Sequence, residues 1–147
     1  MAEVIIVREC KYGQVRVCFG NVSRVEGDIM VLPANNRLAG REGLDEVMQL
    51  AAGPELRAAC TEIAKEKRKT NSQPCGVGEA VTTSAYNLPA EHLVHVVGPD
   101  CRRPTQDQYR RELLKKSYDS LFTEVENLEP RKTLVPVSYT HLRAHET

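Results

Sequence analysis

The residues best placed to do chemistry form a short loop that follows an apolar run and precedes a helical pattern. The apolar run is residues 28–33, and the polar stretch of residues 35–43 that follows it contains Gly40 and Gly43. A strand end, a glycine-containing loop and a helix N-terminus in succession expose backbone N–H groups that can hold phosphate. Glycines also permit the close approach that such a ligand needs. The alternative is that both glycines only form a turn before the helix.

Two histidines and two cysteines are further candidates for chemistry, and we interpret them as structural. His92 and His95 lie at i and i+3 beside a buried run with no acidic partner at a telling spacing, so His95 is predicted to be a core histidine. Cys18 and Cys60 fall on apolar faces and are predicted to be small core residues instead of nucleophiles.

The cysteine pattern bounds the cofactors and the compartment. Five cysteines are scattered along the chain without a Cys-x-x-Cys pair, which argues against a disulfide framework and against a zinc site. We therefore expect reduced thiols, no metal, no cofactor and a cytoplasmic location. The first residues carry no basic region and too short an apolar stretch for a signal peptide, which agrees with that location.

Charge and hydrophobicity exclude two classes of partner. Twenty basic and twenty acidic residues cancel to a formal net charge of +0, so no global field favours nucleic acid or an anionic membrane. No apolar run approaches the roughly 18 residues typical of a membrane span. The length of 147 residues fits one domain. We expect a monomer with no membrane partner and no nucleic-acid partner.

Turn signals and apolar periodicity predict the elements that must position the loop. Apolar or β-branched runs predict strands near residues 4–7, 15–19, 28–33, 79–85, 93–97 and from Thr133. Helical spacing predicts three apolar helix faces: Leu44, Val47, Met48 and Ala51; Leu56, Ala59, Cys60 and Ile63; and Leu114, Tyr118, Leu121, Phe122 and Val125. Gly53 is expected to end the first helix, and Pro54 suits the first position of the second. This alternation predicts a three-layer α/β/α sandwich around a mixed β-sheet, with ligands outside the carboxyl ends of the strands.

Several segments of the chain resemble the macro-domain family in order and spacing. They are residues 20–23 (GNVS), 28–35 (DIMVLPAN), 40–45 (GREGLD), 51–56 (AAGPEL), 78–80 (GEA), 86–90 (YNLPA) and 95–99 (HVVGP). Any one segment is a weak signal, but their common order makes a chance match improbable. The resemblance extends over nearly all of residues 4–136 and implies a macro-domain-like fold that binds ADP-ribose.

The resemblance also implies roles for individual residues. It places Asn35 on the distal ribose and Asp45 where family hydrolases activate or orient water near that ribose. Val22 would line the adenine pocket, and Asn21 stands where the family has an aspartate that accepts from the adenine amino group. The remaining ligand-binding positions are Ala34, Gly40, Arg41, Gly43 and Leu44. Two alternatives stay open: Asn21 as a turn residue, and Asp45 as a first-turn charge favoured by the helix dipole.

Three departures from the family pattern fall in the same region. Leu32 replaces the first asparagine of the family motif and is expected to remove a polar group from the wall of the ribose pocket. Arg41 and Glu42 replace two glycines, and their side chains are expected to crowd the diphosphate unless Arg41 pairs with it. These departures predict a weaker or altered phosphate loop.

The end of the chain resembles a translated sequencing adaptor of the transposase type. We expect residues 1–136 to be a macro domain that stops before its second phosphate loop and final helix, and residues 137–147 to be a non-native tail. In the family, a second glycine-containing loop closes over the phosphates, and no such segment follows Thr133. The chain as it stands is therefore expected to bind ADP-ribose poorly and to be inactive.

Three functions remain open at this point. The first is binding of ADP-ribose, or of an ADP-ribosylated protein, through the loop after residues 28–33. The second is hydrolysis of ADP-ribosyl groups by the complete protein, with Asn35 and Asp45 as catalytic residues. The third is a degenerate, non-enzymatic module that binds another nucleotide, an RNA end or a protein.

Overall fold

The central element of the protein is a four-stranded sheet of order β4-β5-β3-β6. The structure is a computed structural model, and it describes residues 3–40, 43–100, 107–128 and 134–135. β3 (Ile29–Pro33) pairs in parallel with β5 (His92–Val96) and with β6 (Leu134–Val135). β4 (Ala80–Ser84) pairs antiparallel with β5. The predicted mixed sheet is confirmed.

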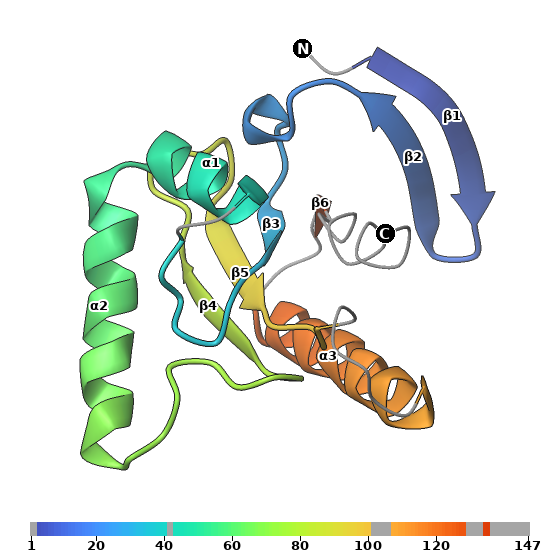
Figure 1. Cartoon of the computed structure of the whole chain (residues 1–147). Coiled ribbons are helices and arrows are strands. Elements are labelled where there is room, and N and C mark those ends of the chain that lie inside the picture. The colour runs from blue at the N-terminus through green and yellow to red at the C-terminus, as the bar shows by residue number, and fades with distance from the viewer. Residues whose placement is uncertain (1–2, 41–42, 101–106, 129–133, 136–147) are drawn as a thin grey trace.

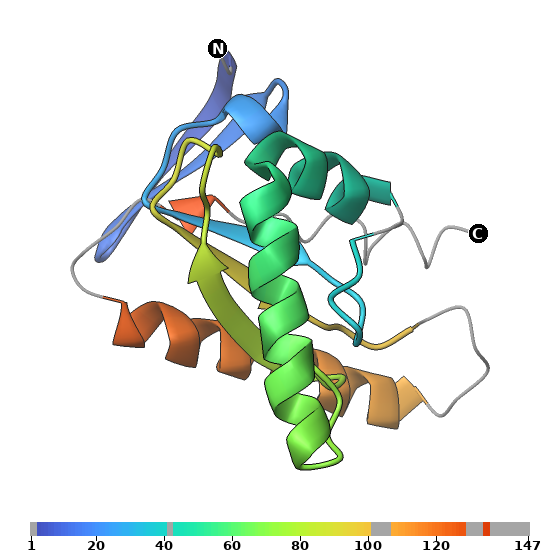
Figure 2. The same ribbon diagram turned by 90° about the vertical axis from the view of Figure 1, so that its left-hand side faces the viewer.

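Helices cover both faces of this sheet, as Figure 1 and Figure 2 show. α1 (Gly43–Ala52) and α2 (Pro54–Lys69) lie on one face, and α3 (Asp107–Asn127) lies on the other. α2 begins after Gly53, whose φ of 96° is a conformation that favours glycine. Pro54 occupies the first turn of α2, as predicted. The arrangement is the predicted three-layer α/β/α sandwich. No helix among the described residues is long and apolar enough to cross a membrane.

β3 is buried on both faces because each face packs against a different helical layer. Met30 and Leu32 belong to the core cluster under α1 and α2, whereas Ile29 and Val31 pack in a second cluster with Leu121 of α3. A continuous apolar run is typical of a parallel strand covered on both sides. The prediction of a buried central strand is confirmed, and its carboxyl end lies between these two layers.

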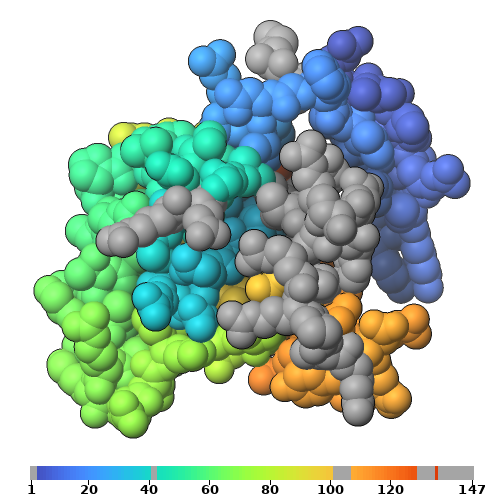
Figure 3. Space-filling model, viewed as in Figure 1, coloured from blue at the N-terminus to red at the C-terminus, as the bar shows by residue number. Residues whose placement is uncertain are grey.

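The first two strands form a separate antiparallel hairpin within the described part of the chain. β1 (Glu3–Cys10) pairs with β2 (Gly13–Phe19), as the sequence predicted, and every residue of both strands is exposed. Figure 3 shows this hairpin in blue at one side of the molecule, opposite the green surface of α2. The prediction that Cys18 is a core residue is wrong, because neither face of the hairpin is covered by described residues.

α1 buries a different face from the one that apolar spacing predicted. Met48 is buried as expected, but Val47 is 52% exposed. The buried face instead carries the polar residues Asp45 and Gln49 beside Met48 and Ala52. Apolar spacing could not identify this face, because polar groups turned toward a loop do not follow the apolar pattern. The helix that follows the candidate loop therefore directs a carboxyl group and an amide into the protein.

α3 is also held differently from the prediction. Tyr118 and Phe122 are 43% and 50% exposed, so the predicted apolar face is buried only in part. Two serines tie the helix to the neighbouring backbone: Ser117 Oγ donates to the Val97 carbonyl at 3.2 Å, and Ser120 Oγ donates to the Gly78 carbonyl at 2.6 Å.

Candidate functional site

The candidate ligand loop, residues 34–40, leaves the carboxyl end of β3 and leads toward α1 (Figure 1). Its first residue continues the sheet, because the Ala34 amide donates to the Val96 carbonyl at 2.9 Å. Further along, the Asn36 carbonyl accepts from the Cys75 amide at 3.2 Å. The loop is thus attached to β5 on one side and to the segment before β4 on the other. It occupies the edge of the sheet where α/β proteins hold ligands.

Asn35 shapes this loop with its side-chain carbonyl. Oδ1 accepts from the backbone amides of Arg37 and Ala39, both at 3.1 Å. Asn35 is exposed, and within the described part of the chain its side-chain nitrogen, Nδ2, makes no hydrogen bond. One end of the side chain therefore orders the loop, and the other end can donate to a ligand.

Asp45 lies in the first turn of α1, directly behind the loop. Its side chain is only 7% exposed, and no described residue donates a hydrogen bond to its Oδ1 atom. Burial raises the pKa of Asp45 to about 6, while Arg57, the Gln49 side chain and the Gly40 backbone each lower it. A carboxyl group with this pKa is ionised at neutral pH and can still accept a proton.

Gln49 and Arg57, which no sequence motif marks, complete the surroundings of Asp45. Gln49, one helical turn later, is 4% exposed. Its Nε2 atom donates a hydrogen bond to the Cys60 sulfur at 3.7 Å. Arg57 of α2 reaches the loop, where its guanidinium donates to the carbonyls of Ala39 and Gly40. The i to i+4 spacing from Asp45 could have identified Gln49. Arg57 carried no such signal, because an arginine on a helix is usually a solvated side chain.

Gly40 is needed at the end of the loop for two reasons. Its φ is +59°, and a Cβ atom there would lie 2.5 Å from Gln49 Cγ. We expect Gly40→Ala to lower the free energy of unfolding by about 2 kcal/mol, because it adds a clash to the backbone strain. Gly43→Ala is the matched control: its φ is +55°, but nothing lies within 4 Å of the added atom. Equal losses in urea unfolding of the two variants would show that the Gln49 contact is unimportant.

Asn21 and Val22, the two residues assigned to the adenine side, lie at a short helix before β3. Asn21 caps a short 3-10 helix, η1 (Val22–Arg24), and its Oδ1 accepts from the Ser23 amide at 3.0 Å and from the Ser23 hydroxyl at 2.7 Å. This geometry is that of a turn residue, the alternative left open by the sequence. Val22, Ala34 and Leu44 are partly buried and all pack on the cluster under α1 and α2.

The remaining assigned positions are Gly43 and Arg41. Gly43 is the exposed first residue of α1. Arg41 lies outside the described residues, as does Glu42.

Leu32 does not occupy the position expected for it. The family resemblance implies a place in the wall of a ribose pocket, but the Leu32 side chain is 0% exposed and packs in the core cluster with Met30, Leu38 and Met48. The alternation of β3 explains the difference, because Leu32 points with Met30 toward α1 and α2. Leucine in place of the family's asparagine therefore contributes to the apolar core at this position.

We accordingly expect Leu32→Asn to destabilise the protein by about 3 kcal/mol, because it removes apolar contacts and buries an amide. Leu32→Met, which conserves volume, should cost less than about 1.5 kcal/mol. Urea unfolding of both variants tests this. A Leu32→Asn protein as stable as Leu32→Met would show that the position opens onto solvent or a polar pocket.

Two structural assignments from the sequence are confirmed. His95 is 0% exposed, and its Nε2 lies 3.0 Å from Thr83 Oγ1. Cys60 is 3% exposed, and burial raises the pKa of its thiol. Neither residue is placed to react with a ligand in solution. The described residues contain no cluster of three or more His, Cys, Asp or Glu side chains suited to a metal ion.

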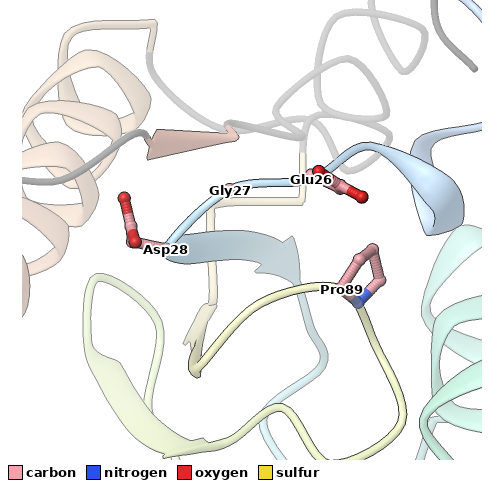
Figure 4. A pocket seen from close by; sticks show the side chains of 4 residues that line it. All are labelled: Glu26, Gly27, Asp28 and Pro89. Atoms are coloured by element: carbon pink, nitrogen blue, oxygen red, sulfur yellow. The ribbon is translucent and has the colours of Figure 1, made fainter.

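An open hollow formed by described residues lies at the opposite edge of the sheet (Figure 4). It has a volume of about 510 Å³ and is lined by Glu26, Gly27, Asp28 and Pro89, which precede β3 and β5. Two carboxylates on its rim do not suit a diphosphate. The sequence predicted that residues 35–43 line the principal pocket. Because that loop includes residues 41–42, the prediction lies in part outside the described residues.

The three-layer fold, with a shaped loop between β3 and α1 at the carboxyl edge of the sheet, is that of an α/β domain. A sequence profile described as Macro domain matches residues 31–142 of the chain. The chain therefore belongs to the Macro domain family.

Curated relatives include two named enzymes. An O-acetyl-ADP-ribose deacetylase 1 of Pantoea vagans is 34% identical over 113 residues, which are 77% of this chain and 62% of that protein. A protein-ADP-ribose hydrolase of Staphylococcus aureus is 31% identical over 117 residues, which are 76% of this chain and 42% of that protein. The chain thus spans less than two thirds of the length of either relative.

Solved structures of a macrodomain from Oceanobacillus iheyensis are similar as well. The form with bound MES has a TM-score of 0.74 and 25% identity and covers 88% of this chain and 67% of that one. The form with ADP has a TM-score of 0.72 and 26% identity, with 84% and 64% covered. Variants of that macrodomain replace one asparagine with alanine, one aspartate with alanine and, in a structure with ADPR, one glycine with valine.

Proposed function

We propose that this chain binds ADP-ribose, free or attached to a protein, through the loop that follows β3. The observation that carries the proposal is the loop itself, which Asn35 shapes and behind which the buried carboxyl group of Asp45 lies. An exposed amide donor and the N-terminal N–H groups of α1 suit a ribose hydroxyl and a phosphate, respectively. Relatives named for ADP-ribose chemistry support this ligand class.

The variants of the Oceanobacillus macrodomain support the same assignment. The substituted asparagine and aspartate are spaced along that chain as Asn35 and Asp45 are here, and the spacing of the substituted glycine falls on Glu42. The valine variant was solved with ADPR. A side chain at the position of Glu42 is therefore compatible with the ligand, and the departure from glycine does not exclude binding.

A calorimetric titration of the chain with ADP-ribose, carried to millimolar ligand, tests the proposal. Asn35→Asp keeps the Oδ1 acceptor that orders the loop but removes the amide donor and adds a charge, so we expect it to weaken binding at least about tenfold. Glu46→Gln is the control, because it removes an exposed charge from the same helical turn as Asp45. The absence of saturable heat for the parent, or equal affinity of Asn35→Asp, would contradict the proposal.

Hydrolysis of an ADP-ribosyl bond is the second candidate function, and the buried carboxyl group of Asp45 favours it. With a pKa of about 6, Asp45 is suited to accept a proton from a water molecule that attacks the bond joining ADP-ribose to its attached group. The proton would then pass to the leaving group. Asn35 would hold the neighbouring ribose in place through its amide nitrogen.

The second candidate predicts a specific pH profile. Release of ADP-ribose from an ADP-ribosylated protein, assayed with this chain and with the complete gene product, should rise with pH through about 6 as Asp45 ionises. Asp45→Asn should lower the rate by about 10²-fold or more, the usual contribution of a general base. Unchanged turnover in this variant would exclude Asp45 as the general base. It would not contradict the proposal that the chain binds ADP-ribose.

We also propose that the protein works as a monomer in the reducing cytoplasm. The four described cysteines, Cys10, Cys18, Cys60 and Cys75, are all free thiols, which supports a reducing compartment.

A further inference from the structure

Arg57 of α2 bonds two consecutive carbonyl oxygens at the end of the ligand loop. Its Nη1 donates to the Ala39 carbonyl, and its Nη2 donates to the Gly40 carbonyl at 3.4 Å. Within the described part of the chain, Arg57 takes part in no salt bridge. The guanidinium is therefore committed to the loop backbone, for which its fixed fork of donors is well suited.

The peptide unit between Ala39 and Gly40 is contacted on both sides. Its carbonyl accepts from Arg57, and its N–H group belongs to Gly40, whose backbone lowers the pKa of Asp45. In a trans peptide these two groups point in opposite directions, so one plane is held between α2 and α1. Gly40 also packs directly on Gln49, where no Cβ atom would fit. The loop end is thus held by side chains from two helices, α1 and α2.

We propose that Arg57 is a positioning residue for the ligand loop, holding the Ala39–Gly40 peptide so that its N–H group faces Asp45. The effect of Arg57 on ADP-ribose affinity rests on the proposed function. Its effects on the loop backbone and on the carboxyl group of Asp45 do not require a ligand. A loop held in this way loses less conformational entropy when it binds, which favours affinity.

The charge of Arg57 acts on Asp45 in the same direction. Among the described residues, the charged or titratable groups that affect Asp45 or are affected by it are Arg57 and the Cys60 thiol, both on α2. Arg57 lowers the pKa of Asp45, as do the uncharged Gln49 side chain and Gly40 backbone. Removing Arg57 should therefore raise the pKa of Asp45, both through the lost charge and through the loosened peptide.

Three variants of α2 separate these effects from a loss of folding. Arg57→Met removes charge and donors at similar length, and Arg57→Lys keeps the charge but loses the fork. Arg68→Met is the control, because Arg68 is exposed near the end of the same helix. Two quantities are measured by NMR without ligand: the pKa of the Asp45 carboxyl group and the hydrogen exchange of the Gly40 amide. ADP-ribose affinity is measured separately.

We expect Arg57→Met to move the pKa of Asp45 upward from about 6 and to accelerate Gly40 exchange at least about fivefold, the factor for one net hydrogen bond. Arg57→Lys should accelerate exchange with a smaller pKa change, and Arg68→Met should change neither. If Arg57→Met matches Arg68→Met in both quantities, the proposal is wrong. If both change as expected but the parent binds no ADP-ribose, Arg57 positions the loop and the proposed ligand is wrong.

Discussion

Replacing Asp45 with asparagine should raise the free energy of unfolding above pH 7 by about 2 kcal/mol. Burial raises the pKa of Asp45 from 3.8 to about 6, so the folded state binds its proton more tightly than the unfolded state does. The stability from this group is present below about pH 4 and is lost as the pH rises to about 6. At neutral pH the buried charge therefore destabilises the fold, as is common for functional groups.

Urea unfolding of the parent and Asp45→Asn at pH 4 and pH 8 measures this effect. The two proteins should differ most at the higher pH and converge at the lower one. Glu46→Gln, the exposed neighbour on α1, should stay within about 0.5 kcal/mol of the parent throughout. If Asp45→Asn is less stable than the parent at pH 8, the carboxylate is a structural group and its functional assignment loses its main support.

His95 should act in the opposite direction over nearly the same pH range. Burial lowers its pKa from 6.5 to about 4, so the folded state keeps the ring neutral while the unfolded state takes up a proton. The stability from this group is present above pH 6.5 and is lost as the pH falls to about 4, by about 3 kcal/mol in all. Nε2 lies beside Thr83 Oγ1, and no described residue bonds to Nδ1, so no acid offsets this loss.

Acid unfolding of His95→Gln checks this second prediction against Asp45→Asn. Glutamine can retain a hydrogen bond to Thr83 but carries no charge. Because the two titrations oppose each other, the parent should show little pH dependence from these groups between pH 4 and 6. As the pH falls from 6 to 4, Asp45→Asn should lose stability steeply, because only His95 titrates in it. His95→Gln should gain stability over the same change, because only Asp45 titrates in it. Equal slopes for the two variants would contradict both pKa assignments.

The sequence predicted the elements that apolar spacing and turn residues determine. The central strand, the start of α2 at Pro54 and the layered fold followed from runs and punctuation that the structure confirms. The burial of His95 was predicted for the same reason, since it sits within a buried strand. The loop position was predicted because a strand end and a helix start bracket it.

What the sequence did not reveal depends on contacts between distant segments. The bonds from Arg57 to the loop join positions 17 and 18 residues apart, and no local pattern marks such a pair. The buried polar face of α1 and the core position of Leu32 depend on which way an element is turned. The exposure of Cys18 depends on what covers the hairpin, which alternation within a strand cannot show.

The most direct test of the central claim is an NMR titration of the isotope-labelled chain with ADP-ribose. Binding at the loop predicts saturable amide shift changes with one common dissociation constant at Asn35, Gly40 and Asp45, extending to Val22 on the adenine side. Gly27, in the hollow at the opposite edge, should not change. Shift changes confined to Gly27 and its neighbours, or none at millimolar ligand, would contradict the assignment of the loop after β3 as the ADP-ribose site.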